Sequence, residues 1–412
     1  MARKMKDSGI EWIGEIPEGW EIKRLGAILQ ERNEVNNPIQ TTSILSLTNN
    51  RGVIPYSEKG NQGNKAKDDL TGYKIAHIGD IVLNSMNVII GSVGLSNYYG
   101  AVSPVYYMLF PRNNIETNIQ YYNYLFQTTA FQQSLRGYGN GILEIRMRIQ
   151  MQKLKTVLLP VPTFLEQSNI TVYLDASLSK LNILLSKTRS SIEEYKKLKQ
   201  AVITQAVATQ QCSHIKLKYL MNVIVDCPHE TPTYSFTGNY YVIRTADQAL
   251  ASLRCDEDMY RLDASEYKKR TRRLTLDKDD IVYGREGERW GLACIVPESN
   301  KYCLGQRIMQ FRCNTKFLYP KYAMYALNSE PVYLQGVADT IGSTSPHVNI
   351  STVCNYLLPV PALTEQKEIA NYLDAKCAEI DRLIAKKEQL VKELESYKKS
   401  LIYEVVTGKR EV

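Results

Sequence analysis

Five positive charges in six consecutive positions are the clearest chemical feature of this sequence. Lysines and arginines supply most of the contacts that proteins make to nucleic-acid phosphates. The residues of this basic run are Lys268, Lys269, Arg270, Arg272 and Arg273. We predict that the run contacts phosphates; the alternative is a solvated charged surface of the same composition. The net charge of +8 agrees with a polyanionic partner without identifying one.

Two other segments of the second half carry groups that suit the edges of bases. Residues 226–232 contain two prolines, which can fix the direction of His229 and Thr231. A glycine-flanked loop after a predicted strand contributes Arg285, Glu286 and Arg289. Arginine pairs with guanine, and glutamate can accept a hydrogen bond from cytosine. A structural hydrogen bond is the alternative for His229, and a metal site is disfavoured because one cysteine and one histidine make half a zinc site.

Similar loops occur at corresponding places in the first half of the chain. The counterpart of the loop at 285–289 contributes Asn84, Ser85 and Asn87, whose polar groups suit adenine. A further polar loop contributes Ser343, Thr344 and His347, and its counterpart contributes Arg146 and Arg148. Because the paired loops differ in side-chain type, we predict that they read different base sequences.

The correspondence between the halves rests on an internal repeat. Residues 158–207 and 357–406 share 18 identities in 50 positions without a gap. Fainter matches precede this segment: we match 79–83 with 279–283, and Gly94-Leu95 with Gly291-Leu292. A duplication of this kind fixes the order of parts as domain, helix, domain, helix.

Each copy of the repeat continues into a long amphipathic stretch. Steps of four and three residues alternate between apolar positions, which is the 3.5-residue period of a coiled-coil seam. The apolar seam positions are Leu174, Leu178, Leu181, Leu185, Ile192, Tyr195, Val202, Leu373, Ile380, Ile384, Val391, Leu394, Leu401 and Val405. The polar breaks also correspond, Thr188 with Lys387 and Lys199 with Lys398. We predict that the two stripes pair, the alternative being two helices that pack only on their own domains.

The regions before the helices have the pattern of mixed α+β domains. Short strands are predicted at 80–83 and 105–110, and a helix at 119–133 with its counterpart at 321–328. The predicted organisation is a domain over 1–163, a helix over 164–211, a domain over 212–362 and a helix over 363–412. A helix of about 45 residues reaches about 65 Å, more than one turn of B-DNA, so the pair could act as a ruler.

These motifs together resemble the specificity subunits of type I restriction–modification systems. The resemblance rests on the N-terminal segment 8–21, on the two L-P-x-P-x-x-x-E-Q segments that lead into long helices, and on the helix end at 401–408. It implies two similar target recognition domains, separated by two antiparallel coiled-coil helices in a pseudo-two-fold arrangement. Each domain would read one half of a bipartite site in double-stranded DNA.

The resemblance also implies partners and a division of labour. Two methyltransferase subunits would dock on the chain, and restriction subunits would join the full complex. S-adenosylmethionine, ATP and Mg²⁺ would be used by those partners, with no cofactor, metal or catalytic residue in this chain. The absence from the sequence of a G-x-x-x-x-G-K-[ST] loop and of an N-P-P-Y or D-P-P-Y segment agrees with a non-enzymatic subunit.

Composition narrows the remaining classes. The eight cysteines form no C-x-x-C pair and are read as free thiols of a reducing compartment. No signal peptide and no long apolar run are present, so a cytoplasmic location without a membrane partner is expected. A free-standing two-domain DNA-binding regulator is the alternative function, and a coiled-coil scaffold without a DNA role is the third.

Overall fold

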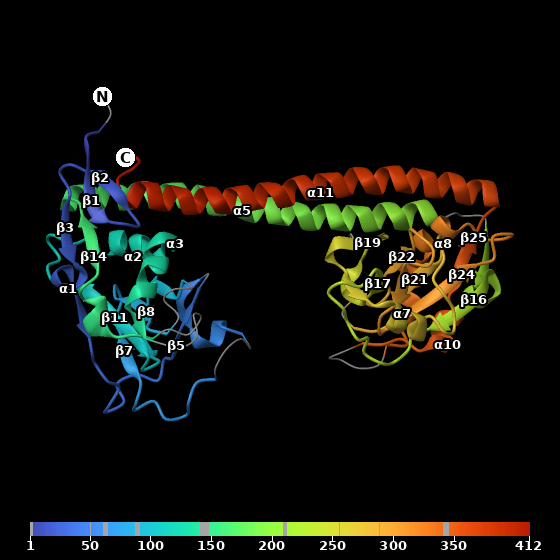
Figure 1. Ribbon diagram of the computed structural model, residues 1–412, viewed down its shortest axis with the longest axis horizontal. Helices are drawn as coiled ribbons and strands as arrows, with labels where there is room; N and C mark the ends of the chain where they lie inside the picture. Colours follow the sequence, from blue (N-terminus) through green and yellow to red (C-terminus); the bar gives the residue numbers. More distant parts are fainter. Residues whose placement is uncertain are drawn as a thin grey trace. The chain divides into compact units, whose positions relative to one another are not determined.

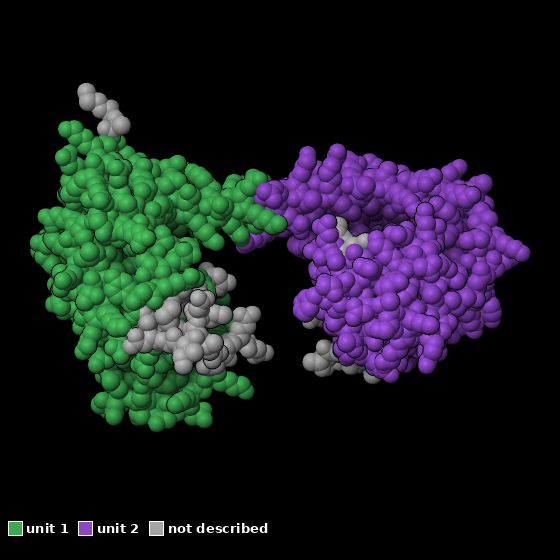
Figure 2. Space-filling model, viewed as in Figure 1, with its two compact units in different colours: residues 1–187, 390–412 green, residues 188–389 purple. Residues whose placement is uncertain are grey.

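The chain forms two compact units, which Figure 2 draws in different colours. Unit 1 contains Met1–Lys187 and Leu390–Val412, and unit 2 contains Thr188–Gln389. The computed structural model describes residues 3–49, 51–60, 65–86, 91–140, 148–208, 212–254, 256–287, 289–340 and 346–412. Each unit therefore includes a part of both long helices, and each is described by itself.

Unit 1 is built around a four-stranded antiparallel sheet (Figure 1). Its strand order is β4 (Leu29–Arg32), β11 (Tyr106–Pro111), β8 (Ile81–Asn84) and β9 (Val93–Leu95). Side chains alternate across a strand, so Ile81 and Leu83 enter the core beneath the helices while Val82 enters a second core with Leu45 and Val53. Both faces of β8 are therefore buried, as its continuous apolar sequence requires.

Helices cover one face of this sheet and a hairpin covers the other. The helices are α2 (Ile119–Gln127) and α3 (Thr129–Ser134), and the hairpin is β5 (Leu45–Thr48) with β6 (Gly52–Pro55). A single helix over 119–133 was predicted. The structure divides it at Thr128, whose backbone is extended and whose hydroxyl accepts a hydrogen bond from the Phe131 amide at 3.3 Å. Threonine thereby ends one helix and caps the next.

Unit 2 repeats this architecture. Its sheet has the order β16 (Met221–Asp226), β24 (Ile308–Cys313), β21 (Ile281–Gly284) and β22 (Ala293–Ile295). Helix α8 (Pro320–Leu327), followed by α9 (Glu330–Val337), packs on β22 as α2 packs on β9. The two sheets have the same order of strands and the same antiparallel pairing, so the prediction of two similar domains is confirmed.

The remaining elements complete the two units. In unit 2 a second sheet has the order β20 (Tyr260–Leu262), β17 (Tyr240–Ile243) and β23 (Tyr302–Leu304), and α7 (Ala264–Arg270) follows β20. Short elements of unit 1 are β1 (Met5–Ile10), β2 (Gly14–Pro17), α1 (Leu25–Ile28), β7 (Lys74–Ala76), β10 (Gly100–Val102), β12 (Gly139–Asn140), β13 (Arg148–Ile149) and α4 (Met151–Leu154). Those of unit 2 are α6 (Leu217–Leu220), β18 (Gln248–Ala249), β19 (Ser252–Leu253) and α10 (Ile350–Cys354).

The strand register corrects one match made from the sequence. Val82 pairs with Gly94 in unit 1, and Val282 pairs with Cys294 in unit 2, so Gly94 corresponds to Cys294. The counterpart of Gly291 is Gly91, three residues earlier than predicted. Both glycines have left-handed backbones, with φ of 94° and 88°, which a side chain would strain. The identity of Gly94 with Gly291 was a coincidence of neighbouring glycines.

The most similar part of the repeat joins each domain to its long helix. Strand β14 (Leu158–Val161) pairs with β3 (Glu21–Arg24), and β25 (Leu357–Val360) pairs with β15 (Ser213–Lys216) in the same antiparallel manner. Gln167 then accepts a hydrogen bond from the Asn118 amide and donates to the Pro162 carbonyl, at 2.8 and 2.9 Å. Gln366 makes the same two bonds, to Tyr319 and Pro361, at the same distances. The shared motif is therefore a buried joint.

The long helices are α5 (Phe164–Val207) and α11 (Leu363–Val406). In unit 1 the start of α5 shares a core with the end of α11, and in unit 2 the end of α5 shares a core with the start of α11. The helices therefore run antiparallel. All twenty seam positions, polar breaks included, are buried or half-buried. The predicted fold class, α+β domains with paired long helices, is confirmed. No helix in the described part of the chain is long and apolar enough to cross a membrane.

Candidate nucleic-acid interface

Two of the predicted segments meet in unit 2 around one carboxylate. Asp226, at the end of β16, accepts hydrogen bonds from the Arg285 guanidinium at 3.1 and 3.2 Å. The same carboxylate lies 3.1 Å from Nε2 of His229. Asp226 thereby holds together the end of its own strand, the loop that follows it and the end of β21. Sequence analysis had selected both partners of Asp226 without a reason for them to be neighbours.

Arg285 is a buried organiser of this region. Its side chain is 8% exposed and also pairs with Glu286 at 2.8 Å. Burial alone would lower the pKa of the guanidinium, but the hydrogen bonds and charge of Asp226 outweigh it, so the pKa is raised. Because the charged form is stabilised by two carboxylates, Arg285 keeps Asp226 and Glu286 in place. This position gives Arg285 a positioning role, and its contact with a base stays a prediction.

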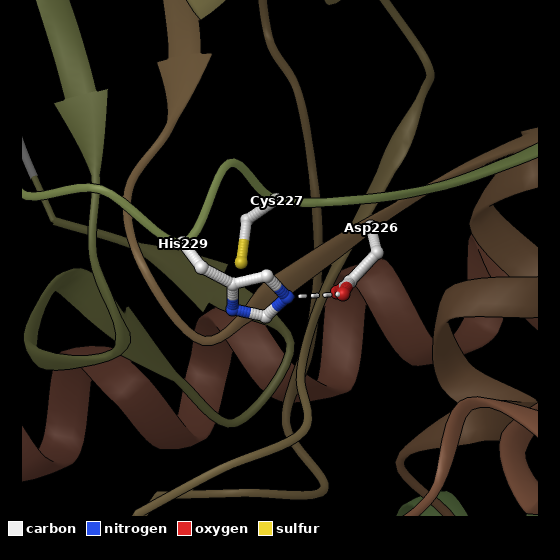
Figure 3. Close-up of side chains that lie close together, drawn as sticks. All are labelled: Asp226, Cys227 and His229. Carbon is white, nitrogen blue, oxygen red and sulfur yellow. Dashed lines mark hydrogen bonds and ion pairs between the residues drawn. The ribbon is translucent and has the colours of Figure 1, made fainter.

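Asp226, Cys227 and His229 form a cluster whose ligand atoms lie within 4.8 Å of one another (Figure 3). These three residue types can bind a metal ion. However, both carboxylate oxygens of Asp226 are already bonded to Arg285, and burial raises the pKa of the Cys227 thiol. Zinc needs a thiolate, and the neighbouring guanidinium would repel a cation. The cluster therefore fits a hydrogen-bonded joint better than a metal site.

The basic run contains one buried and four exposed side chains. Arg270, in the last turn of α7, is buried and donates to the Leu304 carbonyl at 2.9 and 3.0 Å and to the Glu230 carbonyl at 2.9 Å. Lys269 forms an exposed ion pair with Glu230 at 2.9 Å. The exposed members are Lys268, Lys269, Arg272 and Arg273. Four cations are therefore available to a phosphate backbone, while Arg270 clamps the loop at 228–230 to the domain.

The turn between β23 and β24 completes the region and was missed by sequence analysis. Gln306 donates to the Thr231 hydroxyl at 3.2 Å, and the Arg307 amide donates to Sγ of Cys227 at 3.1 Å. Arg307 has a left-handed backbone with φ of 71°, which costs an L-residue about 1 kcal/mol. Nothing in the sequence marks this position, because left-handed turns are usually signalled by glycine or asparagine.

The other predicted residues of unit 2 surround this centre. Arg289 is exposed but donates to the carbonyls of Ala246 and Gln248, at 2.9 and 3.1 Å. His347 forms a β-bridge with Glu286, so this histidine lies near the end of β21. Thr231 is exposed apart from its bond to Gln306. Ser343 and Thr344 lie outside the described residues.

The corresponding place in unit 1 has the same backbone frame with different side chains. The Ser85 amide and hydroxyl donate to the Val105 carbonyl, and the Ile149 amide donates to the Ser85 carbonyl at 2.9 Å. In unit 2 Arg285 donates to the Arg307 carbonyl and accepts from Val348. Asn84 is half-buried and accepts from the Met86 amide at 3.0 Å, and Arg148 is exposed. Asn87 and Arg146 lie outside the described residues.

Comparison with known proteins identifies the family to which the chain belongs. Residues 17–194 and 227–394 match the family model of the type I restriction modification DNA specificity domain. The chain is 29% identical over 132 residues to the type I restriction enzyme EcoBI specificity subunit of Escherichia coli, a match that covers 32% of this chain and 27% of that protein. It is 21% identical to the MjaVIII specificity subunit of Methanocaldococcus jannaschii, over 96% of this chain and 93% of that one.

Solved structures show the same fold. A chain of a type I R-M system, solved in work on its complex assembly and conformational transition, has a TM-score of 0.71 at 15% identity and covers 96% of this chain and 99% of its own. The HsdS subunit from Thermoanaerobacter tengcongensis has a TM-score of 0.51 at 14% identity, with 96% and 98% covered. Because the family model matches both halves, the chain belongs to the type I restriction–modification DNA specificity subunits.

Proposed function

We propose that the two units read the two halves of a bipartite site in double-stranded DNA. The observation that carries this proposal is the repeated frame with divergent side chains at one place. β8 ends at the half-buried Asn84 and is followed by the buried Ser85, whereas β21 is followed by the buried Arg285 and the half-buried Glu286. A protein that reads two different half-sites needs this combination, because base edges are distinguished by donor and acceptor type. The basic run supplies cations for sequence-independent phosphate contacts beside the second set.

The chain assembles an enzyme in this proposal and performs none of its chemistry. Two methyltransferase subunits dock on it, and restriction subunits join them in the full complex. Those partners use S-adenosylmethionine, ATP and Mg²⁺, and this chain holds no cofactor. Support comes from family membership and from the similar chain that was solved in work on complex assembly. The site of action is cellular DNA, so the cytoplasm is the expected location. The paired helices set the spacing between the half-sites.

A domain exchange tests the two-unit proposal. Residues 212–357, between the two long helices, would be replaced by the equivalent region of another specificity subunit. Adenine methylation would then be mapped in cells that express the hybrid with its methyltransferase subunits. We expect one half of the methylated motif to change and the other half to stay. Exchange of residues 1–157 is the matched experiment and should change the other half. If either exchange altered both halves equally, the units would not read independently.

A free-standing DNA-binding regulator remains the second candidate, favoured only by the exposed cations of the basic run. It predicts tight, sequence-specific binding by the chain alone. An assembly subunit needs its methyltransferase partner for full affinity. Gel shifts at fixed salt, with and without that partner, separate the two, since phosphate contacts make affinity steeply salt-dependent.

A further inference from the structure

We propose that Arg307 determines specificity by contacting a guanine in the half-site read by unit 2. This inference rests on the proposed function and adds to it a residue in the turn between β23 and β24. It draws on four independent observations: the backbone conformation of Arg307, the freedom of its guanidinium, its neighbours, and the residue at the same place in unit 1.

The backbone of Arg307 is costly for an arginine. Its φ of 71° is left-handed, a conformation that glycine adopts without strain and that asparagine and aspartate tolerate. Of the other left-handed positions of unit 2 that are not glycine, Asp279 and Asn300 carry such a residue and Ala251 does not. The turn itself therefore gives no reason for an arginine at position 307. Strained residues of this kind cluster at functional sites, where the side chain has a task that offsets the strain.

The guanidinium of Arg307 makes no hydrogen bond to a described residue, whereas the guanidinium groups of its neighbours are engaged. Arg270 and Arg285 are buried and donate to protein carbonyls or carboxylates, and Arg289 donates to two carbonyls. The Arg307 side chain is 52% exposed, and its ion-pair partner among the described residues is Glu286, at 3.9 Å. That separation exceeds a hydrogen bond. With respect to the described part of the chain, the donors of this guanidinium are therefore available to a ligand.

The surroundings of Arg307 hold it firmly at the place where the predicted segments meet. Its amide donates to Cys227, and its carbonyl accepts from the Arg285 amide at 3.0 Å. Its Nη1 lies 3.5 Å from the position that a Cβ on Gly287 would occupy, so the guanidinium passes over the turn after β21. A fixed backbone with a free planar fork is the arrangement that reads O6 and N7 of guanine.

The equivalent position in unit 1 carries a different residue in an ordinary conformation. The Val105 carbonyl accepts from the Ser85 amide, as the Arg307 carbonyl accepts from that of Arg285. Val105 does not adopt a left-handed backbone conformation, and its side chain has no hydrogen-bond donor. The two units therefore share this turn, but only the turn in unit 2 carries a side chain at this position that can donate hydrogen bonds to a base. Two half-sites of different sequence require such a difference.

The test compares three variants in the complex with methyltransferase subunits: Arg307→Gly, Arg307→Lys and Asn300→Gly. Methylation of a library that randomises both half-sites gives the motif, and thermal unfolding gives stability. Arg307→Gly relieves the strained backbone, so its Tm should equal or exceed that of the wild type. It should relax preference for guanine at one position of one half-site by about 5- to 150-fold. Arg307→Lys keeps the positive charge but loses the two parallel donors of the guanidinium. It should therefore weaken the preference for guanine at the same position of the half-site.

Asn300→Gly is the control, because it changes a left-handed residue of unit 2 outside the turn and should leave the motif unchanged. Uniformly weaker methylation of all sequences by Arg307→Gly would show a phosphate contact and overturn the proposal. So would an unchanged motif, or a lower Tm together with loss of all binding. If the wild type itself methylated no bipartite motif, the proposed function would fail first, which separates the two failures.

Discussion

Arginines that look alike in the sequence have different tasks in unit 2. Arg270 and Arg285 are buried and organise loops, Arg272 is exposed, and Arg307 combines exposure with a strained backbone. The difference is set by which carbonyls and carboxylates surround each guanidinium. Those groups come from distant parts of the chain, such as Leu304 for Arg270.

The clamp formed by Arg270 can be tested against a neighbour in the same run. Arg270→Ala removes donors from carbonyls of the 228–230 loop and of Leu304, and leaves the Leu304 carbonyl in a buried position. We expect unfolding free energy to fall by about 2–4 kcal/mol. Arg272→Ala should change stability by less than about 0.5 kcal/mol but lower the salt dependence of DNA binding by about one phosphate contact. Denaturant unfolding and salt titrations measure both, and equal stability losses would contradict the division.

These residues mark the limit of what sequence could give for the site. The basic run, His229 and the loop at 285–289 were selected from residue type and turn residues alone. Their meeting around Asp226, and the inward direction of Arg270, depend on strand pairing and could not be read from composition. Arg307 was missed because its signal is a backbone angle. The sequence shows which residues have side chains suited to DNA contact, but it does not show whether each side chain points outward or into the domain.

At the scale of elements, the long helices were the most predictable part of the molecule. Their apolar positions follow one period over 44 residues each, so a stripe and its partner could be recognised directly. Two of the four polar breaks in these stripes form hydrogen-bonded pairs. Lys199 bonds Asp381 at 2.8 and 2.9 Å, and the repeat-related Lys398 bonds Asn182 at 2.8 Å. The period alone could not show that these polar side chains have hydrogen-bond partners on the other helix.

The two lysines make a matched test of the seam. Lys199 is 6% exposed and also bonds the Leu250 carbonyl at 2.8 Å, which ties α5 to its domain, whereas the pair of Lys398 is exposed. Lys199→Ala should therefore cost about 2–3 kcal/mol of unfolding free energy. Lys398→Ala should cost less than about 1 kcal/mol. Denaturant unfolding of each variant gives the values. Equal costs would mean that burial of the Lys199 ammonium adds nothing.

Asp381→Asn offers a finer version of the same test. It converts the pair in unit 2 to the lysine–asparagine form already found in unit 1. Because an amide oxygen still accepts from the ammonium, we expect a loss of about 1 kcal/mol, smaller than that of Lys199→Ala. A loss as large as that of Lys199→Ala would show that the negative charge, and not the hydrogen bond, holds the lysine.

At the scale of the whole molecule, the repeat predicted two similar domains but not their inner detail. The joints and helices kept their sequence because the same buried bonds recur in both copies, as at Gln167 and Gln366. The domains diverged where side chains face the proposed ligand, so the match of Gly94 to Gly291 went wrong by three residues. Shared strand order outlasts shared sequence, because backbone pairing tolerates many side chains.

The two units should differ in their response to alkali. All eight cysteines lie between 212 and 377, within unit 2, and burial raises the pKa of Cys294, Cys303 and Cys313 to about 12. Thiols of the unfolded chain ionise near pH 8.5 to 9, so these groups favour folding below pH 9, and that contribution is lost as pH rises from about 9 to 12. We expect unit 2 to unfold at lower denaturant at pH 9.8 than at pH 8.

Thiol labelling read by mass spectrometry reports this transition. Unit 1 contains no cysteine, and hydrogen exchange of its peptides is the internal control. Tyrosines of an unfolded chain have a pKa near 10, so at pH 9.8 each contributes less than a cysteine does. Unit 1 also contains buried tyrosines, so the control carries this contribution as well. Rapid labelling of the three buried thiols in native protein at pH 8 would contradict the assignment of their raised pKa to burial.

The order of assembly follows from the two separate segments of unit 1, which lie before and after unit 2 in the sequence. Tyr121 donates to the Val406 carbonyl, Tyr403 donates to that of Trp12, and Leu401 and Val405 complete the core that contains Trp20. On the ribosome, unit 2 can fold from one continuous stretch, whereas unit 1 must wait for residues 390–412, which are made after unit 2. A premature stop near residue 390 would therefore damage the domain that was translated first, and leave the nascent second domain intact.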